Sequence, residues 1–351
     1  MCIRDRPDAR SELGFNVTVD PEIIEGDSSI LVEELINEED MVVTLSKGGD
    51  AKTQPIDTYR AQRRGGRGKM ASSLKEEDYI ERLMVANTHD TILCFTNLGK
   101  VFWLRVFQIP PAGRAARGRP LVNILPLDDE ERITAMLPID EYREDRYIFM
   151  ATSNGTVKKT PLMEFSRKRS TGLIAIELEL DNTLIGAAIT DGTIDVMLFG
   201  NHGKVIRFKE SDVRAMGRTA RGVRGIKLGT KQQVISLMIP DEAGQVLVSS
   251  RNGYGKRSSF EDFPVIGRGG QGVIGMKMSE RNGAVVAATR IFEADEAIFI
   301  SDQGTLVRIR AEDVSLQGRN TQGVRLINLS KKEYLVGMAQ VQEPKQEESE
   351  E

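Results

Sequence analysis

The sequence predicts an all-β fold in which six radial blades close into a propeller-like disc. The first observation behind this prediction is a self-similar segment of about fifty residues that recurs six times in the 351-residue chain. A period of this length is typical of propellers and repeat arrays. The second observation is that each repeat holds four short apolar runs separated by turns. Blades of four short strands pack against one another and leave few exposed sheet edges, so a disc accounts for both observations.

Each repeat opens with a predicted β-hairpin. Its first β-prone run lies at residues 41–45, 92–96, 147–152, 195–199, 245–250 and 297–301. A turn with glycine follows, and the turn glycines are Gly49, Gly99, Gly155, Gly203, Gly253 and Gly304. The Asn-Gly pairs at 154–155 and 252–253 are strong hairpin signals, because both positions of such a turn favour positive φ. A second β-prone run follows each turn, as at residues 205–208.

The second half of each repeat contains a polar loop that ends on another glycine. These loop glycines are Gly68, Gly118, Gly172, Gly222, Gly272 and Gly323, and they follow the turn glycine by 19 residues in five repeats and by 17 in the third. Two more apolar stretches come after the loop, as at residues 324–329 and 334–339. Residues 73–83 begin like a helix with a capping box. We predict strands there, because the same register holds strand patterns in other repeats.

These repeats divide the chain into three segments. Residues 40–340 form the disc, with blades at about 40–90, 91–145, 146–193, 194–243, 244–295 and 296–340. Residues 1–39 are predicted to be an N-terminal segment and linker, of which residues 1–6 fit no repeat and are expected to be non-native. Residues 341–351 hold one basic and five acidic residues, a composition that predicts a disordered tail.

Composition excludes several classes of protein. With 40% hydrophobic and 28% charged residues the chain can bury a core, and no stretch approaches the roughly 18 apolar residues of a membrane span. Neither a membrane location nor a secretory signal is predicted, so we expect a cytoplasmic protein. The two cysteines and two histidines are too few and too scattered for a thiolate metal site or a His-based catalytic site. We therefore expect no catalytic residue and no metal site.

The charge is unevenly distributed along the chain. Residues 1–40 hold 3 basic and 12 acidic residues, whereas residues 41–340 hold 44 basic and 35 acidic. A basic body between acidic ends favours a polyanionic partner for the body.

A column of basic residues appears when the repeats are aligned on the loop glycine. Four positions before it stand Arg64, Arg114, Lys168, Arg218, Arg268 and Arg319. One interpretation is a structural arginine, inherited by every repeat, that pairs with a carboxylate inside each blade. The other is a ring of guanidinium groups placed around the disc to bind phosphates.

Further basic residues surround this column and favour the second interpretation. They are Arg117, Arg119, Lys158, Lys159, Arg167, Arg169, Arg207, Arg221, Arg224, Lys256, Arg257 and Arg308. Aromatic residues are sparse in the same loops, which disfavours stacking on single-stranded bases and favours contact with a duplex backbone. We therefore predict a DNA-binding rim made of these residues and the column.

The first repeat has the most basic loop, formed by Gln62, Arg63, Arg64, Gly65, Gly66, Arg67, Gly68 and Lys69. Glycines let such a backbone approach phosphates closely while arginines bind them. This run resembles the A-box, Q-R-R-G-G-K/R-G, that distinguishes the C-terminal domain of the A subunit of bacterial DNA gyrase, a type IIA topoisomerase. Residues 76–78, 85–90, 204–211 and 318–324 are similar to that family as well, and the resemblance covers roughly residues 11–344.

The resemblance implies a six-bladed β-pinwheel whose outer edge wraps duplex DNA, with the box as part of the DNA-binding site. It implies that the fragment is non-catalytic and supports negative supercoiling by the whole enzyme. The expected partners are double-stranded DNA, the gyrase B protein and the rest of the gyrase A protein in an A2B2 complex. ATP and Mg²⁺ are used by those other parts, with no cofactor in this chain. Two alternatives remain open: the similar C-terminal domain of the topoisomerase IV A protein, and a protein-interaction propeller with an acidic partner.

Overall fold

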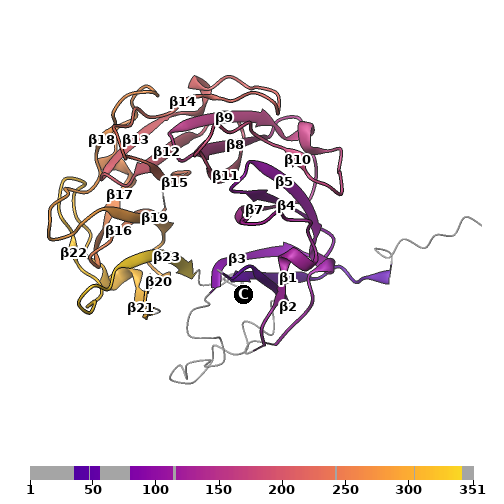
Figure 1. Cartoon of the computed structure of the whole chain (residues 1–351), viewed down its shortest axis with the longest axis horizontal. Helices are drawn as coiled ribbons and strands as arrows, with labels where there is room; N and C mark the ends of the chain where they lie inside the picture. The colour runs from indigo at the N-terminus through magenta and orange to yellow at the C-terminus, as the bar shows by residue number, and fades with distance from the viewer. Residues whose placement is uncertain are drawn as a thin grey trace, which may run out of the picture. The chain divides into compact units, whose positions relative to one another are not determined.

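The computed structural model describes residues 35–46, 48–55, 80–113, 116–241, 243–303 and 305–341. The chain divides into two compact parts, residues 1–36 and 37–351, and nearly all described residues lie in the second. Six antiparallel sheets make up this second part, and they are arranged in a ring (Figure 1). The predicted all-β fold with six blades is confirmed.

Each repeat supplies its strands in the same order. The first strands are β1 (Asp40–Ser46), β4 (Thr91–Thr96), β8 (Tyr147–Thr152), β12 (Asp195–Gly200), β16 (Gln245–Ser250) and β20 (Glu296–Ser301). The second strands are β2 (Asp50–Pro55), β5 (Lys100–Arg105), β9 (Thr156–Pro161), β13 (Lys204–Lys209), β17 (Tyr254–Ser259) and β21 (Leu306–Arg310). Short third strands follow the loop glycines at β6 (Arg119–Pro120), β10 (Leu173–Ile174), β14 (Val223–Arg224), β18 (Val273–Ile274) and β22 (Val324–Arg325).

The last strand of each repeat lies innermost in its sheet. These strands are β3 (Ile80–Asn87), β7 (Ile133–Ile139), β11 (Leu184–Thr190), β15 (Val234–Met238), β19 (Val285–Ile291) and β23 (Leu335–Val341). They line the centre of the ring in Figure 1, and β23 of the sixth blade contacts β3 of the first. From residue 80 onward, the strand predicted over residues 73–83 is observed; residues 73–79 lie outside the described residues.

Short 3₁₀ turns join the second strands to the loops, at η2 (Val106–Gln108), η4 (Leu162–Phe165), η5 (Glu210–Asp212), η6 (Phe260–Asp262) and η7 (Ala311–Asp313). One more, η3 (Leu121–Asn123), directly follows β6. Within the described ranges, no helix has the length and apolar character needed to cross a bilayer.

The outermost strand of a blade comes from the following repeat. The second sheet has the order β10-β5-β4-β7, in which β10 belongs to the third repeat and pairs Leu173 with Val101 of β5. The other sheets with four strands follow the same rule. A sheet of four strands thus combines strands from two successive repeats, an exchange that the sequence did not predict. The second strand of a repeat has a free edge with unpaired N–H and C=O groups, and the next repeat satisfies them.

Among the described residues the sixth sheet has three strands, in the order β21-β20-β23. Its second strand, β21, is therefore the outer edge of the sheet, and Leu306 on it is exposed. In the other sheets the place beside the second strand is taken by the short strand of the following repeat.

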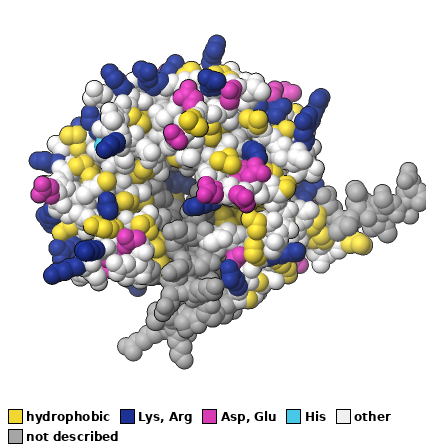
Figure 2. All heavy atoms as spheres, viewed as in Figure 1, with side chains coloured by type: hydrophobic (Ala, Val, Ile, Leu, Met, Phe, Trp, Pro, Cys, Tyr) yellow, Lys and Arg dark blue, Asp and Glu magenta, His cyan; other side chains and the backbone are white. Residues whose placement is uncertain are grey.

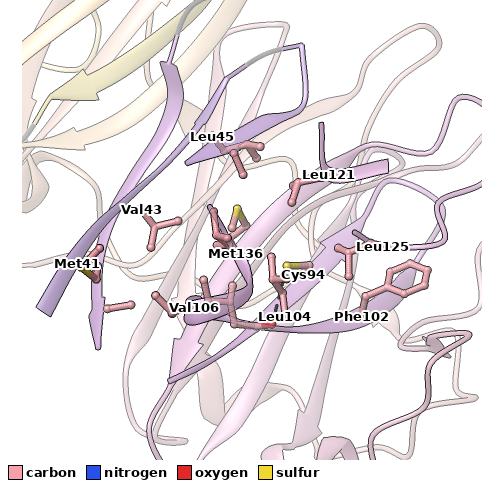
Figure 3. Close-up of a cluster of buried hydrophobic side chains, with 14 residues drawn as sticks. Met41, Val43, Leu45, Cys94, Phe102, Leu104, Val106, Leu121, Leu125 and Met136 are labelled. Atoms are coloured by element: carbon pink, nitrogen blue, oxygen red, sulfur yellow. Dashed lines mark hydrogen bonds between the residues drawn. The ribbon is translucent and has the colours of Figure 1, made fainter. Parts of the chain in front are cut away.

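The core lies between neighbouring blades. Every residue of β4 is buried, because both faces of its sheet are covered. Ile92 and Cys94 pack with residues of the first blade, and Figure 3 shows Cys94 and Val43 in this cluster. Leu93 and Phe95 pack instead with residues of the third blade. The alternation of side chains along a strand thus divides one apolar run between two inter-blade cores.

Candidate nucleic-acid interface

The described loops that carry predicted cations lie on the perimeter of the ring. Each loop leads from a 3₁₀ turn to the short strand at the outer edge of the preceding blade, as at β10, β14, β18 and β22 in Figure 1. Figure 2 shows Lys and Arg side chains gathered along this outer edge, with fewer acidic side chains among them. Strand exchange therefore brings the loops of successive repeats to one surface.

Nine predicted rim residues are exposed on this perimeter. They are Arg117, Arg119, Arg167, Lys168, Arg169, Arg221, Arg224, Arg268 and Arg308. Some of them form ion pairs: Arg221 lies 3.1 Å from Glu177, Arg117 contacts Asp50, and Arg308 contacts Glu296. The Arg221–Glu177 pair joins two exposed groups, and such a pair contributes little, about 0 to 1 kcal/mol, so a phosphate group can replace Glu177 at small cost.

Four predicted rim residues are buried instead, which corrects their expected contact with DNA. The exposed fractions are 0% for Lys158, 7% for Lys159, 0% for Lys256 and 6% for Arg257. All four lie on the second strand of a hairpin, beneath the loop of the following repeat. On these two strands both the third and the fourth residue after the turn glycine are buried, because neighbouring elements cover both faces of the sheet.

The fourth residue after the turn glycine anchors the next repeat in five blades. Arg257 Nε donates to Val314 O at 2.7 Å, Trp103 Nε1 to Phe165 O at 3.0 Å and Lys159 Nζ to Glu210 O at 3.3 Å. Thr53 Oγ1 does the same with Ile109 O at 3.2 Å. Each acceptor lies in or next to the 3₁₀ turn that begins the next loop.

Arg207 is the fifth anchor and is half-buried. It lies 2.8 Å from Asp195 in an ion pair and donates to Phe260 O at 2.9 Å. Among the predicted rim residues, Arg207 thus joins the buried group as a structural cation. Donor side chains at a regular distance from the turn glycine were a signal in the sequence for this role.

Among the described members of the basic column, Lys168 and Arg268 are exposed, whereas Arg218 and Arg319 are half-buried. Arg268 Nε donates to Asp212 O at 2.8 Å and its Nη1 to Arg224 O at 3.1 Å, while Arg319 Nη1 donates to Ile274 O at 3.0 Å. Both arginines thus reach the end of the preceding short outer strand, and the acceptors are carbonyls rather than the carboxylates of the structural interpretation. Arg218 is half-buried, 3.7 Å from Glu164.

The most basic loop cannot be placed in this way. Gln62, Arg63, Arg64, Gly65, Gly66, Arg67, Gly68 and Lys69 lie outside the described residues, and so does Arg114. Their predicted role in DNA binding stays a prediction.

Backbone hydrogen bonds link successive loops along the perimeter. Gly269 N donates to Gly225 O at 2.6 Å, Lys227 N to Gly270 O at 2.8 Å, and Lys277 N to Thr321 O at 2.9 Å. The loops of the fourth, fifth and sixth repeats are thus joined into one chain of contacts. Cations mounted on such a surface are already ordered, which lowers the entropy cost of binding a rigid polyanion.

Other chemistry has little support in the described part of the chain. No three His, Cys, Asp or Glu side chains gather there as a group able to hold a metal ion. Burial raises the pKa of the Cys94 thiol to about 12. Burial and the nearby Lys204 lower the pKa of His202.

Comparison with known proteins points to one family. Six segments match the family described as DNA gyrase C-terminal domain, beta-propeller, at residues 40–87, 90–140, 146–191, 195–241, 244–291 and 295–342. The DNA gyrase A protein from Pseudomonas aeruginosa is 53% identical, with the match covering 92% of this chain and 40% of that protein. The chain thus spans well under half the length of this relative.

Two solved structures have the same fold. A DNA gyrase A C-terminal domain is 26% identical with a TM-score of 0.68, and the match covers 86% of this chain and 99% of that one. The C-terminal domain of a DNA topoisomerase IV has a TM-score of 0.75 at 24% identity, covering 87% of this chain and 94% of that one, which supports the fold alone. The resemblance inferred from the sequence is confirmed: the chain belongs to the DNA gyrase C-terminal domain family of β-propellers.

Proposed function

We propose that this chain binds duplex DNA with little sequence preference and wraps it around its perimeter, as the non-catalytic C-terminal domain of a DNA gyrase A protein. The observation that carries this proposal is a set of exposed cations on the perimeter. The loops of successive repeats on this perimeter are joined by backbone hydrogen bonds. In the intact A2B2 enzyme, the gyrase B protein and the rest of the gyrase A protein use ATP and Mg²⁺ for negative supercoiling in the cytoplasm. The wrap supplies the DNA geometry for that reaction.

Energetics favour a wrapping surface over a single contact. Bending a duplex by 40 to 90 degrees costs on the order of 1 to 6 kcal/mol, and a longer wrap costs more. One loop cannot offset this cost, whereas phosphate contacts from several repeats add together. Six such contacts give a slope of log K against log salt of about −5.

The experiment measures the linking-number change in a nicked plasmid that is sealed by ligase with the protein bound. A test variant changes Arg221, Arg224 and Arg268 to Gln, and a second changes Arg63, Arg64 and Arg67 to Ala. The matched control changes Arg132, Arg143 and Lys331 to Gln, which removes the same charge from exposed positions outside the perimeter loops.

We expect a linking-number change that grows with protein concentration, survives in the control and is reduced in both test variants. Tight binding that is independent of DNA length and leaves the linking number unchanged contradicts wrapping. Absence of DNA binding favours the other candidate, a propeller whose basic perimeter meets an acidic protein.

A further inference from the structure

Two buried lysines lie directly beneath the perimeter loops. Lys158 on β9 and Lys256 on β17 each follow their turn glycine by three residues, and both are fully buried. Lys158 Nζ donates to Ala175 O at 2.8 Å and also to Arg218 O. The ammonium group of each lysine therefore lies under a loop that the following repeat supplies.

Lys256, two blades further on, binds the corresponding loop of the sixth repeat. Its Nζ donates to Gly318 O at 2.8 Å, to Arg319 O at 2.5 Å and to Thr321 Oγ1 at 3.1 Å. The two lysines thus bind the main chain at the column residues themselves, Arg218 and Arg319. Lys52 in the first blade is a third, more exposed example, with Nζ 3.2 Å from Gly113 O and 3.0 Å from Ala116 O.

The pattern alternates around the ring. Lysine occupies this position in the first, third and fifth repeats, whereas the second, fourth and sixth have Phe102, Ile206 and Val307. An apolar side chain is therefore compatible with the fold at this position. Core packing alone does not require a lysine here.

The burial of these ammonium groups is energetically unfavourable. Among the described residues, neither Lys158 nor Lys256 has a carboxylate within the 4.0 Å of an ion pair. Removing a charge from water without such a partner is costly even when carbonyls accept its hydrogen bonds, so these lysines are poor choices for stability. Their role is therefore to be found in the loops whose carbonyls they bind.

We propose that Lys158 and Lys256 are positioning residues for DNA binding, which hold the loops of the fourth and sixth repeats so that Arg218 and Arg319 face phosphate groups. This inference rests on the proposed function. An ammonium group that binds two successive carbonyls, as Lys256 does, restricts the main chain at the arginine. The restriction leaves less disorder to be lost when DNA binds.

A phosphate bound near these loops also affects the protonation of each lysine. Burial, together with Arg218, lowers the pKa of Lys158 to about 8, and Glu164 opposes this shift. Burial lowers the pKa of Lys256 to about 8 as well, with Asp262 opposing and Arg319 adding to the shift. A phosphate near either loop favours the protonated lysine, so DNA binding and protonation support each other.

The test is a double-mutant cycle on duplex DNA affinity. Lys256→Met is measured in the native chain and in an Arg319→Ala background, with Ile206→Met as a control at the equivalent position of the fourth repeat. We expect Lys256→Met to weaken binding about tenfold and to reduce the salt slope by about 0.9, the value for one lost phosphate contact. In the Arg319→Ala background the same change should weaken binding less than about twofold, because the contact is already absent.

A pH profile separates positioning from simple support of the fold. Between pH 7 and pH 9.5 we expect the affinity of the native chain to fall more steeply than that of a Lys158→Met, Lys256→Met double variant. If the lysine variants fold poorly, Thr321→Val is a milder substitution, because it removes a single acceptor of Lys256. We expect it to lower the affinity for duplex DNA several-fold.

Three outcomes overturn the inference while native DNA binding is intact: native affinity in Lys256→Met, equal losses in both backgrounds, or identical pH profiles. If the native chain itself does not bind DNA, the proposed function fails, and this inference fails with it.

Discussion

The loop glycines allow a direct test of strand exchange, and Gly272 is the best placed. Its φ is +74°, and a Cβ atom added there would lie 2.4 Å from Val205 O and 2.8 Å from Val205 C. Val205 belongs to β13 of the preceding repeat and pairs with Val273, the residue after Gly272. An alanine at 272 must therefore push the short strand β18 away from the blade that it completes.

The cost of Gly272→Ala can be estimated from these contacts. A left-handed conformation costs a non-glycine residue about 1 to 2 kcal/mol. Loss of one or two strand hydrogen bonds adds about 0.5 to 1.5 kcal/mol each. The reduced entropy of the unfolded chain returns about 0.4 to 1 kcal/mol. We expect a net destabilisation of about 0.5 to 4.5 kcal/mol, with a central value near 2.

The control lies in the same loop, five residues earlier. Gly267 has no atom within 4 Å of an added Cβ and no positive φ, so Gly267→Ala should be neutral or slightly stabilising. The assay is equilibrium unfolding in urea followed by circular dichroism, with both variants compared with the native chain. If the free energies of unfolding of the two variants agree within about 0.5 kcal/mol, the reasoning from strand exchange is refuted.

Three further predictions concern charge and protonation. Changing Arg221, Arg224 and Arg268 to Gln should make the slope of log K against log salt shallower by about 2 to 3. The control, with Arg132, Arg143 and Lys331 changed to Gln, should leave the slope nearly unchanged. Equal slopes for the two variants in filter-binding titrations contradict the assignment of the rim. Cys94, with its pKa raised to about 12 by burial, should be alkylated about a thousandfold more slowly in the native protein at pH 8 than in denaturant, which site-resolved mass spectrometry measures. Hydrogen bonds from Ser301, Thr305 and Ser330 lower the pKa of Glu333 from 4.5 to about 2, so its contribution to stability is complete above pH 4.5 and lost as the pH falls toward 2. Glu333→Gln should remove that part of the acid dependence of the free energy of unfolding, and an unchanged acid profile counts against it.

Much of this architecture is readable from the sequence. The glycine turns and the alternating apolar runs recur at a regular period, and hairpins depend on such local signals. Six repeats, the all-β class and the family followed from these patterns together with the basic run at residues 62–69. The strands at β4 and β8 begin within one residue of the predicted runs.

The partners of the cations were not readable from the sequence. Lys256 and Arg268 are both basic residues, yet Lys256 is buried under a loop and Arg268 is exposed on the perimeter. Which of them can meet DNA depends on where the loop of the next repeat lies. The alternation of lysine and apolar residues three positions after the turn glycine was visible in the sequence. Most of the acceptors of these lysines are main-chain carbonyls, which every residue has, so the sequence did not reveal them.

The sequence by itself thus determined the number of blades, the hairpins and the basic character of the loops, because these depend on residues close together in the chain. Only the tertiary structure decided that each blade is completed by the following repeat, that β23 meets β3, and which cations face solvent. Pairing between strands about 70 residues apart, such as Val101 with Leu173, uses backbone groups that every residue has. Such pairing leaves no mark on composition, and it is this pairing that sets the loops at the perimeter.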